Sequence, residues 1–206
     1  MTFLEWTSLA SVVLLGAMSP GPSLAVVVSN TLRRGAGAGV SAGLAHGLGV
    51  ALYAVAVVSG LAVLITTSPT LFTIIQWAGA AFLAWIGFQS LRNSGGTLQE
   101  HPDSGLQHPA VQGFSVAFLN PKLAIFFLAL FSQFLDVDAS LTTKAVMVVT
   151  MGVIDASWYC GVSLLLAQPA ILPRLQRAEL VINRLFGIIL IGLAIRIVWP
   201  VVSRWL

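Results

Sequence analysis

Six apolar stretches follow one another along the chain, separated by short connections that carry the polar residues, glycines and prolines. They span about 4 to 31, 38 to 66, 70 to 91, 113 to 135, 144 to 168 and 181 to 203. Each reaches the roughly 17 to 25 residues that a helix needs to cross a bilayer. The first has no basic region before it, so it is predicted to be a retained helix rather than a signal peptide. The pattern predicts an all-α integral membrane protein with six transmembrane helices.

The longest polar stretch, residues 93–112, divides these helices three and three. We therefore predict a single domain, 1–206, with one half at 1–92, the polar linker, and a second half at 113–206. Because each half has an odd number of helices, the second half must enter the membrane the other way up. The arithmetic is that of a 3+3 inverted repeat, which is typical of transporters.

Composition agrees with this picture and removes other classes of protein. Hydrophobic residues make up 57% of the chain and charged residues only 8%, whereas soluble domains are about 25% charged. A soluble enzyme and a nucleic-acid-binding domain are excluded. No metal-ligand cluster, phosphate loop or haem motif occurs, so we expect neither a metal nor a cofactor.

The formal charge of +3 comes mostly from arginines in the connections. Six of them follow the first and third predicted helices or surround the turn before the sixth: Arg33, Arg34, Arg92, Arg174, Arg177 and Arg184. The positive-inside rule makes these connections cytoplasmic. Both termini are then predicted to be periplasmic or extracellular.

Two proline breaks interrupt the membrane-length stretches. Pro20-Gly21-Pro22 precedes Ser23 in the first, and Asn120-Pro121-Lys122 lies in the fourth. Proline removes a backbone donor and frees a carbonyl, which in hydrocarbon must find partners in protein or in a water-filled cavity. Both breaks fall in the cytoplasmic half of the membrane and are predicted to face each other at a substrate site. The alternatives are a packed kink for the first break and a snorkelling Lys122 for the second.

Ionisable residues inside the membrane are the other candidates. His46 and Asp155 each lie roughly 15 Å into their helices, near the midplane, so they are predicted to meet. Asp155 is a candidate proton carrier or ammonium partner, the alternative being a structural pair with Lys122. His46 titrates near neutral pH and is a candidate proton relay, or else a packing residue. Trp158 and Tyr159 follow Asp155 closely and are predicted to shape the substrate site.

Glycines at positions 35, 39, 43 and 47 form a small-residue stripe that permits close helix approach, either within one subunit or in a homo-oligomer. The same region matches the G-x-S-x-G pattern of serine hydrolases around Ser41. That motif requires a strand, a sharp turn and a helix, and none of these is predicted here. An intramembrane hydrolase that uses Ser41 and His46 is the remaining enzyme hypothesis, and no catalytic residue is predicted otherwise.

Several of these features together resemble the lysine exporter superfamily, in its homoserine/threonine efflux branch. The matching segments are the Pro-Gly-Pro break, the glycine-rich start of the second stretch, Gly113 to Lys122, Phe126-Phe127-Leu128, Gln133-Phe134, Asp155 to Tyr159, and Asn183-Arg-Leu-Phe-Gly187 to Arg196. Ser23 and His46 depart from the residues usual in that family. The resemblance implies export of amino acids across the bacterial inner membrane, driven by the proton gradient.

These observations predict an exporter of amino acids or close derivatives that works by alternating access around a midplane site. Asp155 would hold the substrate ammonium, and Lys122 with freed backbone donors would hold its carboxylate. The partners expected are the amino acid, protons and the lipid bilayer, with no nucleic acid. A passive channel for small zwitterions is the alternative, and it predicts only downhill flux.

Overall fold

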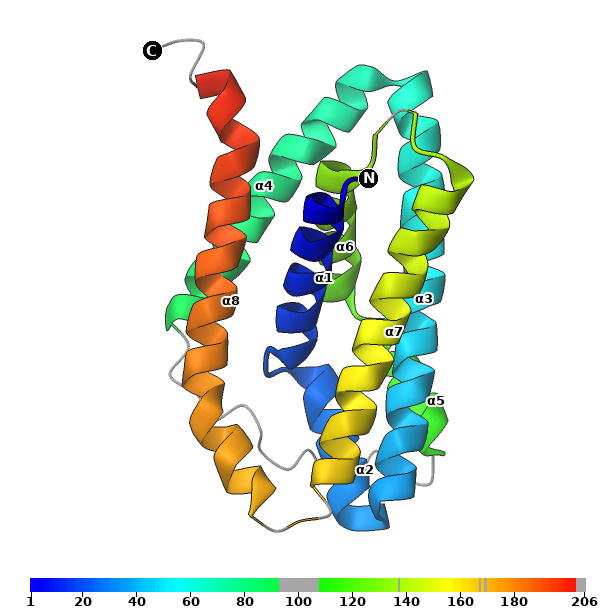
Figure 1. Ribbon diagram of the computed structural model, residues 1–206, viewed down its shortest axis with the longest axis vertical. Helices are drawn as coiled ribbons and strands as arrows, with labels where there is room; N and C mark the ends of the chain where they lie inside the picture. The colour runs from blue at the N-terminus through cyan, green and yellow to red at the C-terminus, as the bar shows by residue number, and fades with distance from the viewer. Residues whose placement is uncertain (93–107, 137, 167, 169, 203–206) are drawn as a thin grey trace.

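The computed structural model describes residues 1–92, 108–136, 138–166, 168 and 170–202 (Figure 1). Every regular element in the described residues is a helix. In chain order they are α1 (Phe3–Met18), α2 (Pro22–Arg34), α3 (Ala36–Thr67), α4 (Pro69–Arg92), α5 (Pro109–Phe118), α6 (Pro121–Phe134), α7 (Leu141–Leu165) and α8 (Ile171–Val202). The predicted all-α class is confirmed.

Four helical stretches are each long and apolar enough to cross a bilayer: Ala36–Thr67, Thr70–Arg92, Leu141–Leu165 and Ile171–Arg196. Two bent pairs, α1 with α2 and α5 with α6, pass the same test when each pair is taken as one span. The described part of the chain therefore holds four to six apolar spans, and it is a membrane protein.

The two proline breaks separate the helices of these bent pairs. The chain turns by 57° between α1 and α2 and by 54° between α5 and α6. Pro22 and Pro121 are the first residues of α2 and α6, where the missing N–H costs no intrahelical bond. At the second break the Asn120 side chain accepts a hydrogen bond from the Lys122 N–H at 3.0 Å. Both predicted interruptions are confirmed.

Some predicted boundaries are wrong. Helix α8 begins at Ile171 rather than near 181, so Arg174, Arg177 and Arg184 lie within a helix and not around a turn. The helix extends beyond the apolar stretch because water can solvate the polar side chains in its first turns. Helix α5 begins at Pro109 with His108 as its N-cap, so the linker predicted at 93–112 is too long at its C-terminal end. Residues 93–107 of that linker lie outside the described residues.

Small residues let α3 approach two neighbours closely. A Cβ added at Gly47 would lie 2.6 Å from the Ala156 Cβ on α7, and one added at Gly113 on α5 would overlap the Ala42 carbonyl oxygen on α3. Gly39 and Gly43 make similar approaches to α7. The predicted stripe therefore packs helices within one chain. Its first member differs, because Gly35 joins α2 to α3 at a φ of 88° with open space around its Cα.

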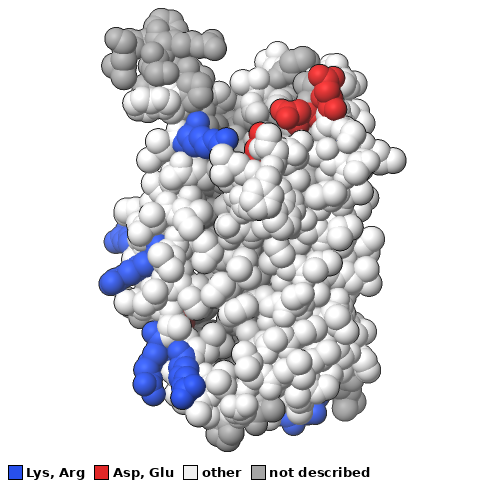
Figure 2. All heavy atoms as spheres, in the orientation of Figure 1, with Lys and Arg blue, Asp and Glu red and all other residues white. Residues whose placement is uncertain are grey.

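Charged side chains are distributed unevenly along the molecule. On the face that Figure 2 shows, Lys and Arg side chains extend from the middle of the molecule toward the end that holds the α2–α3 connection. Acidic side chains on this face gather toward the opposite end, beside one further basic side chain. The N-terminus and the C-terminal end of α8 lie toward that acidic end (Figure 1).

Candidate functional site

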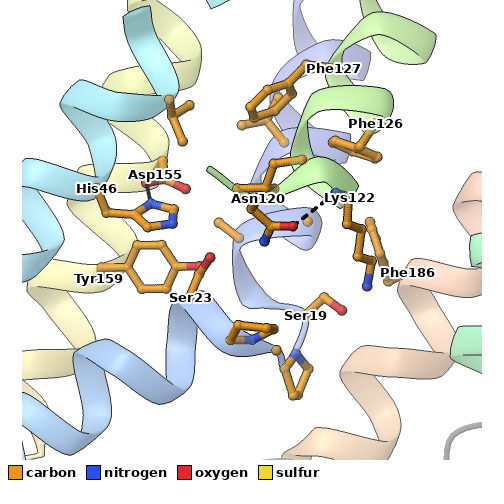
Figure 3. A pocket seen from close by; sticks show the side chains of 18 of the residues that line it. Ser19, Ser23, His46, Asn120, Lys122, Phe126, Phe127, Asp155, Tyr159 and Phe186 are labelled. Carbon is orange, nitrogen blue, oxygen red and sulfur yellow. Dashed lines mark hydrogen bonds and ion pairs between the residues drawn. The ribbon is translucent and has the colours of Figure 1, made fainter. Parts of the chain in front are cut away.

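A small cavity lies between the two helix breaks, and we call it the inner cavity. Its volume is about 60 Å³, whereas sites for small molecules occupy roughly 300 to 1,000 Å³. Side chains from α1, α2, α3, α4, α6, α7 and α8 line it together with the first break (Figure 3). Its polar side chains are Ser19, Ser23, His46, Asn120, Lys122, Asp155 and Tyr159. The two breaks are far apart in the sequence but lie at one cavity, as predicted.

His46 on α3 and Asp155 on α7 form a buried pair at one wall of the inner cavity. The His46 Nδ1 lies 2.6 Å from the Asp155 Oδ2, and the two side chains are only 1% and 7% exposed. Close packing of α3 on α7 through Gly43 and Gly47 places the two residues opposite each other. Burying a carboxylate is costly unless a partner holds it, and His46 provides that partner. The prediction that these residues meet is confirmed.

Tyr159 extends this polar wall by one helical turn. Its ring contacts the His46 imidazole edge-on, with ring centroids 4.7 Å apart, and its hydroxyl lies beside the Ser23 side chain (Figure 3). Ser23 is the second residue of α2, directly after the first break. A continuous series of polar groups therefore runs from Asp155 through His46 and Tyr159 to the start of α2 (Figure 3).

The second imidazole nitrogen of His46 has no partner among the described residues. Within the described part of the chain, its Nε2 is one of the few buried side-chain nitrogens without a hydrogen bond. In Figure 3 this side of the ring faces the cavity. A buried polar atom of this kind calls for a partner that the protein itself does not supply. A bound ligand or a water molecule in the cavity would provide it.

Lys122 lies on the opposite side of the cavity from Asp155. Its ammonium points away from the carboxylate in Figure 3, and its side chain is exposed. The alternative that Asp155 and Lys122 form a structural pair is therefore wrong, because His46 occupies the carboxylate. Lys122 instead extends from the inner cavity toward the surface.

Apolar side chains form the rest of the wall. They are Val13, Val50, Ile86, Leu123, Phe126, Phe127 and Phe186. Phe126 and Phe186 come from α6 and α8, and their ring centroids lie 6.1 Å apart. The cavity therefore has a charged, hydrogen-bonding wall and an aromatic and aliphatic wall. That combination suits a ligand with one polar end and one apolar end.

Most of the residues predicted for the substrate site line the inner cavity: Pro20, Gly21, Pro22, Ser23, Asn120, Lys122, Asp155 and Tyr159. Pro121 is the first residue of α6. Trp158 does not line the cavity and packs instead against the apolar cluster that contains Leu24 and Val162. With 3.6 residues per turn, the residue four positions after Asp155 shares its helix face more closely than the residue three positions after it.

Ten residues that line the inner cavity had no role assigned from the sequence, among them Ser19, Phe126 and Phe186. Phe126 follows Lys122 by one helical turn, so the helical period was a usable signal for it. Ser19 directly precedes the first break, and this position in the sequence was a usable signal for it. Phe186 comes from α8, and no local pattern connects it to the breaks. Only the packing of α8 against α4 and α1 reveals its position.

The arrangement around Ser41 does not match a hydrolase. Ser41 lies within α3, a continuous helix, and does not line the inner cavity. Its predicted base, His46, directs Nδ1 to Asp155 and leaves Nε2 without a partner in the described residues. The serine and histidine are therefore not joined by a hydrogen bond.

Comparison with known proteins gives the family. An uncharacterised membrane protein of Escherichia coli K12, YahN, is 32% identical over 90% of this chain and 85% of its own length. Proteins named leucine efflux protein from Klebsiella pneumoniae and Salmonella typhimurium are 26% and 27% identical over 86% and 93% of this chain and 87% and 93% of their own lengths. No solved structure matches significantly. Residues 14–199 match the family described as LysE type translocator, so the chain belongs to the LysE type translocators, a family of membrane transporters.

Proposed function

We propose that the protein exports amino acids with apolar side chains, leucine among them, or close derivatives. The observation that carries this proposal is the inner cavity at the two breaks, with the His46–Asp155 pair on one wall and aromatic and aliphatic side chains on the other. The names of the leucine efflux relatives support the same substrate class. The homoserine/threonine branch suggested by the sequence stays a prediction.

Proton coupling follows from competition for one carboxylate. Asp155 is paired with His46 at 2.6 Å in this structure, and a substrate ammonium would need the same carboxylate. A buried carboxylate tolerates one positive partner and is costly without any. The substrate and a proton, held on His46 or on Asp155, therefore exclude each other. Mutual exclusion at one site is what an antiporter requires.

Alternating access would come from movement of one half of the chain against the other. Each half contains a broken helix pair followed by two long helices, which supports the proposed 3+3 inverted repeat. The inner cavity, at about 60 Å³, has room for a few water molecules and not for an amino acid. Substrate binding therefore needs the halves to separate.

Orientation and location complete the proposal. We assign the bacterial inner membrane, with the end that carries Arg33, Arg34 and Arg177 in the cytoplasm, because cytoplasmic connections are enriched in Lys and Arg. Both termini then face the periplasm. The end with more acidic side chains in Figure 2 is the periplasmic one.

Transport in proteoliposomes tests this function against a passive channel. Vesicles that are acidic inside should accumulate labelled leucine above its external concentration, as protons leave in exchange. Collapse of the pH gradient with an ionophore should return the leucine to equilibrium. Flux that only follows the leucine gradient, with or without the pH gradient, would identify a channel.

His46→Asn tests the role of the imidazole. The Asn amide retains a donor near the position of Nδ1, so the hydrogen bond to Asp155 can persist while the titratable ring is lost. We expect leucine–leucine exchange at equal pH to remain and pH-driven accumulation to fall about tenfold, within the usual range of coupling energies. His108→Asn is the matched control, because His108 is an exposed N-cap and Asn also caps helices. Unchanged accumulation in His46→Asn would remove His46 from the coupling mechanism.

A further inference from the structure

A second cavity opens beside the inner one, and we call it the vestibule. Its volume is about 370 Å³, and it is lined by Ser19, Pro20, Gln89, Ser90, Arg92, Lys122 and Asn183. Ser19, Pro20 and Lys122 also line the inner cavity. The first helix break and Lys122 therefore form a shared wall between the two spaces. The vestibule is about six times larger and lies within the range of small-molecule sites.

The vestibule is positively charged. Arg92 and Lys122 both line it, and no Asp or Glu is among its described lining residues. The Arg92 guanidinium carbon lies 5.3 Å from the centre of the Phe88 ring, a contact that orients the side chain at the end of α4. Neither cation forms an ion pair with another described residue. Both cations line the vestibule, where they would attract an anion.

Asn183 gives an independent sign of a missing ligand. The side chain is only 1% exposed, and its Nδ2 has no hydrogen-bond partner within the described residues. Leaving a buried donor unsatisfied costs about 1 to 3 kcal/mol, so such an atom needs an explanation. Asn183 lies on α8 and lines the vestibule together with the two cations. An acceptor in the vestibule would satisfy it.

We propose that the vestibule binds the substrate carboxylate between Arg92, Lys122 and Asn183 before the substrate passes the first break into the inner cavity. The identity of that substrate rests on the proposed function, whereas the preference for a carboxylate rests on these three side chains. Lys122 contacts both spaces, so it can keep hold of the carboxylate while the ammonium moves toward Asp155. The vestibule is thus a docking site on the cytoplasmic side, separate from the site of proton exchange.

Binding of isocaproate, which is leucine without its ammonium group, tests the vestibule without requiring transport. The protein is placed in phosphatidylcholine nanodiscs, and isocaproate binding is measured by calorimetry. Arg92→Gln should weaken binding about tenfold, as expected for loss of one charge-assisted hydrogen bond, and Arg92→Lys should recover part of it. Arg177→Gln changes the net charge equally at an exposed position outside the vestibule and should have no effect. Leucinamide, which has no carboxylate, should not compete.

The Asp155→Asn variant distinguishes a failure of this proposal from a failure of the proposed function. Isocaproate has no ammonium, so its binding should survive Asp155→Asn even though transport of leucine should not. If the wild type does not transport leucine, the binding measurement still decides whether the vestibule takes a carboxylate. Equal dissociation constants for wild type and Arg92→Gln would overturn the proposal. Loss of wild-type binding when phosphatidylglycerol is added to the nanodiscs would also overturn it, since the vestibule would then be a site for an anionic lipid headgroup.

Discussion

Asp155→Asn is expected to abolish accumulation of leucine in proteoliposomes that are acidic inside. The substitution removes the one carboxylate that lines the inner cavity among the described residues, and leaves His46 without its partner at 2.6 Å. The neutral amide that replaces the carboxylate cannot take up a proton and cannot form an ion pair with a substrate ammonium. We therefore expect the initial rate of pH-driven uptake to fall about a hundredfold, as for loss of the coupling free energy between proton and substrate.

Asp136→Asn is the matched control for this experiment. Asp136 is exposed after the end of α6 and lies outside the inner cavity, so the same change of charge there should leave uptake unchanged. Gel filtration of both variants checks that each is folded and monodisperse. If Asp155→Asn is folded and still concentrates leucine to the wild-type level, Asp155 is not the coupling group.

Gly113→Ala is expected to destabilise the protein strongly. A Cβ at this position would overlap the Ala42 carbonyl oxygen, which belongs to the backbone of α3 and cannot rotate away. Relief requires α5 to move away from α3 as a whole, and overpacking of this kind typically costs about 1 to 3 kcal/mol or more. We expect the midpoint of thermal unfolding in detergent to fall by about 5 °C or more.

Gly60→Ala on α3 serves as the control, because a Cβ added there has nothing within 4 Å. Alanine favours helix over glycine by about 1 kcal/mol, so this variant should be as stable as the wild type or slightly more stable. Equal midpoints for Gly113→Ala and the wild type would show that α3 and α5 are packed less closely than the structure has them.

The elements that the sequence predicted best were those with strong local chemistry. Pro20, Pro22 and Pro121 cannot continue a helix, so both interruptions were visible without any tertiary information. Asp155 and His46 stood out because ionisable groups are rare within apolar stretches, and helix rise placed them at similar depth. The same reasoning also allowed Lys122 as a partner of Asp155, and that alternative is wrong. Depth along a helix does not say which face a side chain occupies.

Helix boundaries were predicted less well where part of a helix consists of polar residues. The residues from Ile171 to about 180 are helical and partly polar, and hydropathy measures only the apolar part of a helix. Trp158 was assigned to the site from its position in sequence, but the helical turn directs it to an apolar cluster. A criterion based on helix faces would have separated it from Tyr159.

The sequence by itself determined that this is a helical membrane protein with two broken helices, because backbone chemistry and apolar length act locally. Only the tertiary structure decided which residues of different helices face each other. The close approach of α3 to α7 through Gly43 and Gly47 pairs His46 with Asp155. The approach of α8 to α4 places Asn183 and Arg92 in the lining of one vestibule. These pairings depend on interhelical distances that small residues allow but do not select, so the site exists only once all the helices are packed.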